Sequence, residues 1–519
     1  MDLATRRSLG AYYTSEDTAE WMAGELLTES SVSILEPSAG DGAFVDAVKM
    51  VARLREQKVK VTAVEINEKA VELLQSRKGV KVVHQDFHLF EDGLYDAIIG
   101  NPPFVRFRHL DSRSADIAAK SCSKIIGRDL DVSGSIWMSI VLHSIERLRI
   151  NGRIAYVLPS DALYVRYARP FWKHLASRFG ELRIVRCNER LFPEILQDVV
   201  LLFANGAGKS TNSVVCEDYE SFSDLKKRNL SATSKVLVED ILSGSKPFMK
   251  ALLSPSEREW LRDLQSETME AKEVVKFNIG YVSGHKSFFH PSDEVVRSFR
   301  LPERSIKKSV VTGRKMNRAA LSISEVESAT ENLWLPDPQR LTAGELRYIA
   351  WGEEQSIHMG HKASRRSPWY LVPGVMKPDF FVTVFGDLPR LIINDAGLPA
   401  SNSILTGKFI KTEKPLYFAL SWYTSVTRLG IELSVHSLGG GVLVLVPREA
   451  DAIRMPPVYH GKVPASLLNR LEKCLRVNNL EGAYAVGDEW LLRNGWNPLD
   501  LEKSREIAQR LRLRRITKS

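Results

Sequence analysis

Long hydrophobic runs and cysteines are both scarce in this 519-residue chain. No apolar run approaches the roughly 20 residues that a membrane-spanning helix needs, so we expect no membrane span. The N-terminal stretch MDLATRRSLG has no apolar segment behind its basic residues, so we also expect no signal peptide. The few cysteines show neither metal-ligand nor redox spacing; they are Cys122, Cys187, Cys216 and Cys474. We therefore expect reduced thiols in a cytoplasmic protein without a metal site.

Acidic residues are outnumbered as well. The chain has 72 Lys and Arg against 63 Asp and Glu, which gives a net charge of +9. A basic balance fits a polyanionic partner such as nucleic acid, but an ordinary basic protein has the same balance. The content of 44% hydrophobic and 26% charged residues is typical of globular proteins, and the length predicts two or three domains.

Short β-branched runs alternate with amphipathic segments from about residue 31 to 204. After the first run, Phe44, Val48 and Val51 recur at helical spacing. Strands that alternate with helices predict an α/β fold with a doubly wound, mostly parallel sheet. A helix near Trp137 is expected to close at Asn151-Gly152. The predicted strands are 32–37, 59–66, 80–86, 95–100, 153–159, 181–187 and 198–204.

The pattern changes near Gly206. The stretch NGAGKSTNS, residues 205–213, is small and polar, which is typical of a linker between domains. It contains Gly-Lys-Ser without the spacing of a phosphate-binding loop, so we expect no NTPase site there. Beyond about residue 245, short strands, helices and loops mix without a βα repeat. We predict two domains, 1–240 and 241–519, the second with an α+β fold.

Acidic residues end the first three predicted strands. The first ends in EPSAGDGAF, starting at Glu36, and its Gly40 and Gly42 allow a tight turn and close backbone approach. The second ends in Glu65, which can accept hydrogen bonds from ribose hydroxyls. The third ends in Asp86, which can accept from the exocyclic amine of an adenine. One such acid is commonly a helix cap, but three together predict a pocket for a nucleoside with an amine-bearing or positively charged tail.

The fourth predicted strand, YDAIIG, runs into Asn101, Pro102, Pro103 and Phe104. Proline lacks an N–H and has a fixed φ, so the strand ends in a rigid corner. The Asn101 side chain and the Pro102 carbonyl are two acceptors that can bind both hydrogens of an –NH2 group on a planar substrate. Phe104 offers a face on which that ring can stack. The simpler alternative is an Asn-Pro turn beside a core aromatic.

In this order, EPSAGDGAF, Glu65, Asp86 and NPPF resemble the motifs of amino-methyltransferases that use S-adenosylmethionine. Because the cofactor motifs precede NPPF and a long region follows it, the chain is similar to gamma-class N6-adenine DNA methyltransferases of restriction–modification systems. Residues 9–27 resemble the family's N-terminal cofactor motif, although Thr14 is followed by serine where the family has proline. Residues 190–203 resemble the segment that supplies a second aromatic, here Phe192, to the target base.

The resemblance implies a class I, Rossmann-like catalytic domain followed by a DNA-recognition domain, with S-adenosylmethionine as cofactor and double-stranded DNA as substrate. It implies methyl transfer to N6 of a flipped-out adenine, with Asn101 and Pro102 at the amine and Phe104 and Phe192 stacked on the ring. No metal is implied. The implied cofactor contacts are Thr14, Glu36, Pro37, Ser38, Gly40, Gly42, Glu65, Ile66, Asp86, Phe87 and Asn101.

The C-terminal half resembles the family's recognition region in the segments 277–289, 307–316, 365–373 and 436–447. Basic side chains there are candidates for phosphate and base contacts, although each is equally an ordinary surface charge. The candidates are Lys286, Arg314, Lys315, Arg365, Arg366 and the arginines of the C-terminal tail.

Three other functions remain open from the sequence. An Asn-Pro-Pro corner serves any planar amine, including one in RNA or a protein glutamine, although the glutamine enzymes usually have tyrosine in the fourth place and lack a long C-terminal region. A non-catalytic DNA-binding protein is a second alternative. A fused nuclease is a third, but no separate stretch is long enough to hold one, so we expect any cognate restriction endonuclease to be a separate protein.

Overall fold

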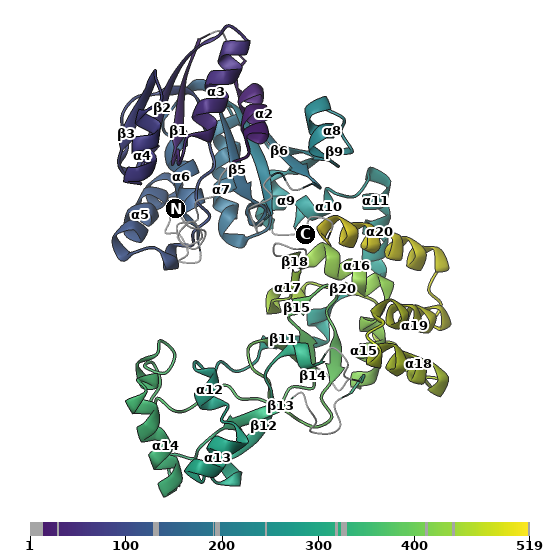
Figure 1. Ribbon diagram of the computed structural model, residues 1–519. Helices are drawn as coiled ribbons and strands as arrows, with labels where there is room; N and C mark the ends of the chain where they lie inside the picture. Colours follow the sequence, from purple (N-terminus) through teal and green to yellow (C-terminus); the bar gives the residue numbers. More distant parts are fainter. Residues whose placement is uncertain are drawn as a thin grey trace. The chain divides into compact units, whose positions relative to one another are not determined.

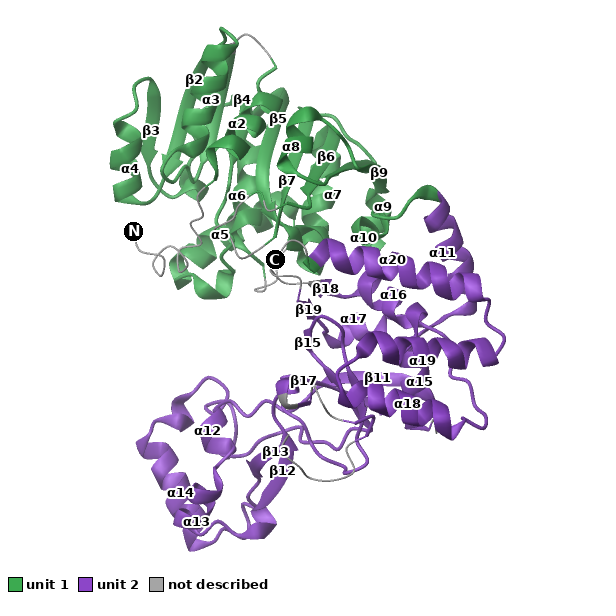
Figure 2. Ribbon diagram, turned by 45° about the vertical axis from the view of Figure 1, so that its right-hand side comes forward, with its two compact units in different colours: residues 1–255, 516–519 green, residues 256–515 purple. Residues whose placement is uncertain are grey.

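The computed structural model describes residues 14–28, 31–127, 134–189, 191, 198–243, 246–316, 320–322, 330–410, 414–437 and 442–516. The chain divides into two compact units, residues 1–255 with 516–519 and residues 256–515 (Figure 2). The first unit therefore extends past residue 240, where the sequence suggested a boundary.

A nine-stranded sheet forms the centre of the first unit, in the order β3-β2-β1-β4-β5-β7-β6-β8-β9 (Figure 1). Strands β1 to β5 pair in parallel, and β7 lies antiparallel between β5 and β6. The sheet continues with β8 parallel to β6 and β9 antiparallel to β8. The strands are β1 (Ser31–Pro37), β2 (Lys58–Glu65), β3 (Val80–His84), β4 (Tyr95–Gly100), β5 (Leu148–Pro159), β6 (Phe179–Cys187), β7 (Val199–Ala207), β8 (Ser213–Tyr219) and β9 (Ala232–Leu237).

This order is the doubly wound order 3-2-1-4-5-6 with one antiparallel strand inserted. The seven strands predicted from the sequence are all present. The expectation of a mostly parallel sheet holds for β1 to β5, whereas the sheet as a whole is mixed.

Helices cover both faces of this sheet because its strands alternate their side chains between two buried clusters. In β1, Ile34 belongs to the cluster under α2, α3, α4 and α8, and Leu35 belongs to the cluster under α5, α6 and α7. The helices of the unit are α2 (Glu16–Leu26), α3 (Ala43–Leu54), α4 (Glu68–Gln75), α5 (Ser112–Ile126), α6 (Ile136–Ile145), α7 (Arg169–Arg178), α8 (Phe222–Lys227), α9 (Val238–Ser243) and α10 (Pro247–Lys250).

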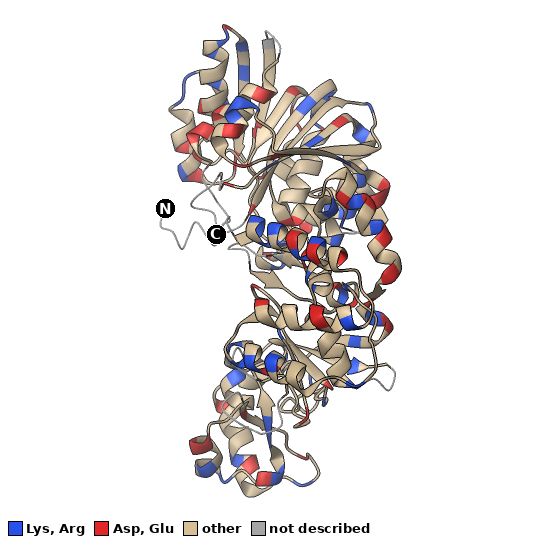
Figure 3. Ribbon diagram, turned by 90° about the vertical axis from the view of Figure 1, so that its right-hand side faces the viewer, with Lys and Arg blue, Asp and Glu red and all other residues tan. Residues whose placement is uncertain are grey.

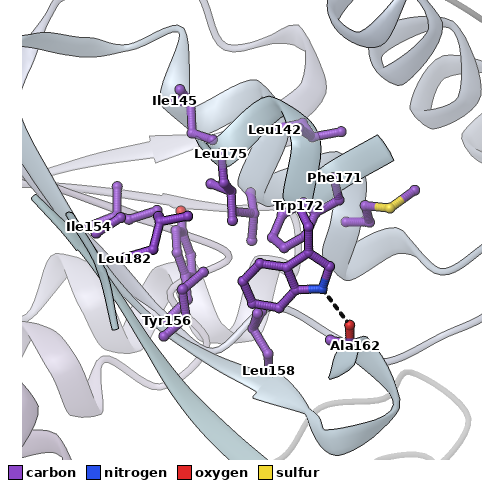
Figure 4. Close-up of a cluster of buried hydrophobic side chains, with 14 of the residues drawn as sticks. Leu142, Ile145, Ile154, Tyr156, Leu158, Ala162, Phe171, Trp172, Leu175 and Leu182 are labelled. Atoms are coloured by element: carbon purple, nitrogen blue, oxygen red, sulfur yellow. Dashed lines mark hydrogen bonds between the residues drawn. The ribbon is translucent and has the colours of Figure 1, made fainter. Parts of the chain in front are cut away.

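Figure 4 shows the second of these clusters. Ile154, Tyr156 and Leu158 of β5 point toward side chains of α6 and α7. The Trp172 indole fills the space between them and donates a hydrogen bond from Nε1 to the Ala162 carbonyl at 2.7 Å. The buried indole is thus both packed and hydrogen-bonded, and it anchors α7 against the end of β5.

Two local predictions are wrong. Asn151-Gly152 does not close a helix, because α6 ends at Ile145 and both residues lie inside β5. Asn151 adopts a φ of 62°, and the register with β4 shifts at this point, so the pair forms a bulge instead of a helix cap. Residues 205–213 are not a domain linker, because they end β7 and lead into β8 of the same sheet.

The second unit has an α+β fold around a four-stranded antiparallel sheet in the order β11-β17-β14-β16. Its strands are β10 (Met269–Glu270), β11 (Val275–Ile279), β12 (Ile306–Val310), β13 (Thr330–Trp334), β14 (Phe380–Thr383), β15 (Phe385–Gly386), β16 (Leu391–Ile393), β17 (Ile404–Phe409), β18 (His436–Ser437), β19 (Leu443–Val444) and β20 (Arg454–Met455). Its helices are α11 (Pro255–Glu267), α12 (Lys286–Phe289), α13 (Asp293–Phe299), α14 (Ala343–Glu354), α15 (Pro415–Trp422), α16 (Ser425–Ser434), α17 (Pro447–Asp451), α18 (Ala465–Arg476), α19 (Leu480–Arg493) and α20 (Pro498–Ile516).

Two searches over the described residues were negative. None of their helices is both long and apolar enough to cross a bilayer. No group of three or more His, Cys, Asp or Glu side chains among them is placed to hold a metal ion.

Candidate functional site

The carboxyl ends of β1 to β4 bring the candidate residues to one edge of the first sheet. Because these strands are parallel neighbours, residues that follow them lie side by side. Glu36 is the last residue but one of β1, Glu65 ends β2, Asp86 follows β3, and Asn101 follows β4. Residues separated by 65 positions in the chain are thus assembled by topology alone.

A glycine turn links β1 to α3 at this edge. Gly40 and Gly42 have φ values of 56° and 88°, which side chains other than glycine rarely adopt. A Cβ on Gly42 would lie 2.8 Å from Leu74 Cδ2, whereas a Cβ on Gly40 would meet nothing within 4 Å. Ser38 also has a positive φ, 55°, and its hydroxyl donates to the Pro37 carbonyl at 2.5 Å. The open space at Gly40 gives a ligand close access to the backbone.

Glu65 holds the turn against the end of β2. Its Oε2 accepts from the Gly40 N–H at 2.7 Å, and its Oε1 accepts from the N–H groups of Ile66 and Asn67 at 2.9 and 2.8 Å. The carboxylate is therefore fixed before any ligand arrives. The neighbouring Ile66 side chain is 62% exposed, so an apolar surface lies beside a fixed acceptor.

Glu36 is a buried carboxyl that is not fully satisfied. Its side chain is only 2% exposed, and its Oε2 has no hydrogen-bond partner among the described residues. Burial raises the pKa of Glu36 well above its ordinary value, and the neighbouring carboxyl of Asp41 raises it further. An orphaned acceptor of this kind fits a ligand that brings a positive charge or an N–H donor.

Asp86 is oriented by a histidine that the sequence analysis missed. Its Oδ1 accepts from both the backbone N–H and Nδ1 of His88, each at 2.9 Å. His88 Nε2 in turn lies 2.8 Å from the hydroxyl of Ser139 in α6. Burial opposes ionisation of Asp86, but the hydrogen bonds from His88 hold its pKa below the ordinary value. The carboxylate thus stays ionised at neutral pH in a fixed orientation.

The ring of Phe87, which follows Asp86 in the chain, lies in the core. Its ring is buried, stacks on Phe90 at 6.0 Å and meets His143 edge-on at 5.1 Å. The Phe87 ring thus packs inside the core, next to Asp86 in the chain.

The corner after β4 is built around Asn101. Gly100 leads into it, and a Cβ there would lie 3.2 Å from the buried Tyr156 ring, so a side chain at the last position of β4 would be tightly packed. Asn101 Nδ2 donates to Thr14 Oγ1 at 3.4 Å, so one amide hydrogen is engaged and the orientation of the amide is restrained. Thr14 of the N-terminal motif thus contacts the corner directly.

The aromatic residues of the corner are only partly described. Phe104 is partly buried and packs against both core clusters of the sheet. Phe192 lies outside the described residues. The residue before it, Leu191, accepts hydrogen bonds from the hydroxyls of Ser15 and Thr18, both at 3.4 Å. The segment that leads to Phe192 therefore starts beside α2 and the residues next to Thr14.

Several basic candidates in the second unit are engaged inside the protein. Arg366 donates to the carbonyls of Val282 and Ser283 at 2.6 and 2.8 Å. Basic and acidic residues are interspersed over the helices (Figure 3), and four tail arginines form ion pairs. These pairs are Arg505–Asp488, Arg510–Glu257, Arg512–Asp387 and Arg515–Glu432.

The other basic candidates keep more exposure. Lys286 is 66% exposed and lies 3.6 Å from Glu331, and Arg314 and Arg365 are also exposed. The side chain of Lys315 lies outside the described residues.

Comparison with known proteins gives two family matches. Residues 25–192 match the family described as Eco57I restriction-modification methylase. Residues 245–492 match the family described as the C-terminal domain of the Type II methyltransferase M.Eco57I. The range 25–192 includes Glu36, Glu65, Asp86 and Asn101. The range 245–492 includes most of the second unit.

The chain is also similar to a curated relative and to two solved structures. The Type II methyltransferase M.AccI of Acinetobacter calcoaceticus is 23% identical over 482 residues, which cover 87% of this chain and 86% of M.AccI. A DrdV–DNA complex matches 91% of this chain with a TM-score of 0.50 and 12% identity, which shows a shared fold. The type IIG restriction endonuclease BpuSI matches 97% with a TM-score of 0.42 and 16% identity.

This chain spans 58% of the DrdV chain and 65% of the BpuSI chain. Both halves of the sequence thus match Type II restriction–modification proteins. These matches support a DNA methyltransferase of a restriction–modification system.

Proposed function

We propose that this protein is a site-specific DNA methyltransferase that transfers the methyl group of S-adenosylmethionine to N6 of an adenine in double-stranded DNA. It would act in the cytoplasm as the modification enzyme of a restriction–modification system. The observation that carries the proposal is the Asn101-Pro102 corner, which lies at the same sheet edge as Glu65 and Asp86. The family matches support DNA as the molecule that carries the amine.

The acidic strand ends fit S-adenosylmethionine. Glu65 would accept from the ribose hydroxyls and Asp86 from the adenine amine, with Ile66 against the ring. The unpartnered Oε2 of Glu36 suits the positively charged end of the cofactor. When bound, the cofactor supplies a methyl group on a positively charged sulfur. The protein's part is to hold it in place beside the corner.

Asn101 and Pro102 would prepare the attacking amine. The Asn101 Oδ1 and the Pro102 carbonyl accept the two N6 hydrogens, which leaves the nitrogen lone pair available for attack on the methyl group. Both acceptors bind the amine more strongly as positive charge develops on nitrogen. Thr14 positions the Asn101 amide through its 3.4 Å hydrogen bond, so orientation adds to the rate.

The target adenine must leave the helical stack to reach this corner. Enzymes that react at a base extrude it from the duplex at a cost of a few kcal/mol. Phe104, together with Phe192, would stack on the flipped ring and offset part of that cost. We propose that residues 241–519 recognise the DNA sequence, and that a cognate restriction endonuclease cleaves the same site when it is unmethylated.

The proposal is tested by expressing the protein in a host that lacks DNA methylation and mapping N6-methyladenine by single-molecule sequencing. We expect one short motif to be methylated throughout the genome, with no methylation from the Asn101→Ala variant. Methyl incorporation only into RNA, or only into a protein glutamine, would replace the DNA assignment by one of those alternatives. Binding of DNA without methyl incorporation into any substrate would make the protein a non-catalytic DNA-binding protein.

A further inference from the structure

A groove of about 550 Å³ opens in the first unit between α7, the C-terminal end of α5, and α9. One wall is basic because of Arg166, Arg169 and Lys173, and it also includes His174, whose pKa is lowered by burial. The opposite wall is apolar and includes Leu242. No Asp or Glu is among the described residues that line it. An anionic molecule is therefore the occupant that the charge of the groove favours.

Two of the cations have no partner among the described residues. Arg166 and Lys173 are exposed and form no ion pair or hydrogen bond with any residue in the described part of the chain. At the C-terminal end of α7, by contrast, Arg178 is paired with Glu146 at 2.9 Å. Arg169 donates to the Leu242 carbonyl at 3.5 Å, which ties the basic wall to α9. The groove is thus held in shape while two of its charges remain available.

A buried nitrogen adds a further free group to the same wall. His174 Nε2 is shielded from solvent and has no hydrogen-bond partner among the described residues. A buried polar atom without a partner destabilises the folded protein. Because this nitrogen is shielded, a ligand oxygen could accept from it only after the His174 ring turns toward the groove.

The spacing of the cations suits a regular polyanion. Arg169 and Lys173 are separated by one helical turn, which is a rise of ~6 Å along α7. Two nucleotide steps of one DNA strand span ~7 Å along the duplex axis. A row of cations on a straight helix therefore matches the repeat of a phosphate backbone better than the irregular charges of a folded acidic protein.

The groove begins next to the corner after β4. Arg166 opens the short helix Arg166–Ala168, which follows the carboxyl end of β5. Within it, Tyr167 packs against the same core cluster as Phe104. Burial raises the pKa of the Tyr167 hydroxyl, and the positive charge of Arg106 acts in the opposite direction. Tyr167 therefore lies close to Arg106, which is in the loop that leaves the corner. The Arg166 end of the groove therefore lies near the loop that leaves the corner.

We propose that this groove binds backbone phosphates of the DNA next to the adenine that is methylated. The inference rests on the proposed function, because it takes duplex DNA as the substrate. Its contacts would be independent of sequence and would hold the duplex in place while the base is flipped.

The test compares two double charge reversals in the full-length protein. The first, Arg166→Glu with Lys173→Glu, changes the groove. The matched control, Lys58→Glu with Lys60→Glu, makes the same change in net charge at exposed positions near the amino end of β2. Duplex DNA binding is measured over a range of salt concentrations, and S-adenosylmethionine binding and thermal unfolding are measured as checks on folding.

We expect the groove variant to lose roughly tenfold in DNA affinity per lost phosphate contact at about 0.1 M salt, and its salt slope to fall by about 0.9 per contact. The control should retain the wild-type slope and methylation rate. Equal slopes for the groove variant and the control would overturn the groove proposal, even where the wild type methylates DNA. Equal slopes together with a selective loss of polyglutamate binding would assign the groove to an acidic protein. Failure of the wild type to methylate any DNA would instead count against the proposed function.

Discussion

Two carboxyl groups at the same sheet edge have opposite surroundings. Glu36 is buried with an unpartnered oxygen, and its pKa is raised by burial and by Asp41. Asp86 is also partly buried, but the hydrogen bonds from His88 lower its pKa. Ionisation of Glu36 is therefore unfavourable without a ligand, whereas Asp86 is ionised and held in place as a hydrogen-bond acceptor. Such pairs of opposed environments are typical of functional sites.

Glu36→Gln tests this difference. The pKa of Glu36 is higher in the folded state than in the unfolded state. Its contribution to the free energy of unfolding is therefore fully present below the unfolded-state pKa of about 4.3 and is lost as the pH rises through the folded-state pKa. Without cofactor, Glu36→Gln should therefore be more stable than the wild type at pH 8, by about 1–3 kcal/mol, and equal to it near pH 4. Urea unfolding between these values measures the difference.

The same substitution should weaken S-adenosylmethionine binding about tenfold, because a hydrogen bond to a charged group is lost. Calorimetric titration measures this affinity. A variant that is less stable at pH 8, or that binds the cofactor as tightly as the wild type, would contradict the assigned role of Glu36.

Asn101→Ala separates catalysis from cofactor binding. The substitution removes an acceptor for the target amine but none of the contacts at Glu65 or Asp86. Loss of one preorganised hydrogen-bonding group lowers turnover by about 10²- to 10³-fold in other enzymes, and we expect a loss at least this large. Single-turnover methylation assays and cofactor titration measure the two properties. Turnover close to that of the wild type would rule out the corner as the catalytic element.

At the level of elements, regular patterns were predictable and local exceptions were not. The seven strands from β1 to β7 follow from their runs of β-branched residues, and the acidic strand ends follow from their positions. The bulge at Asn151-Gly152 was read as a helix cap because the two features use the same residue types. The Asp86–His88–Ser139 chain joins residues 51 positions apart, and no local pattern encodes that contact.

Gly42→Ala tests the turn that links β1 to α3. Gly42 combines a φ of 88° with a Cβ position 2.8 Å from Leu74 Cδ2. Gly79 is a matched control, because its φ is 75° but a Cβ there would meet nothing within 4 Å. Gly79→Ala should lose about 1 kcal/mol from backbone strain, and Gly42→Ala about 2–3 kcal/mol because a contact must also shift. Chemical denaturation compares them, and equal losses would show that the contact has no effect.

For the whole molecule, net charge is a poor guide to the residues that bind a polyanion. The tail of the chain is rich in arginine, yet Arg515 is buried and pairs with Glu432 at 2.8 Å and with Asp387 at 3.0 Å. Arg365 is exposed and has no ion pair with any residue that the structure describes. The excess of +9 therefore includes charges that stabilise the second unit and charges that remain available to DNA.

Arg515→Gln and Arg365→Gln should separate these two uses of charge. Removal of Arg515 leaves Glu432 buried without its partner, and breaking a buried pair in this way destabilises proteins by about 3–5 kcal/mol. The melting temperature should fall, while the salt dependence of DNA binding below that temperature should stay that of the wild type. Arg365→Gln should leave the melting temperature unchanged and reduce the salt slope by about 0.9, the value for one phosphate contact. Because both substitutions remove one positive charge, a general effect of net charge would change the two slopes equally.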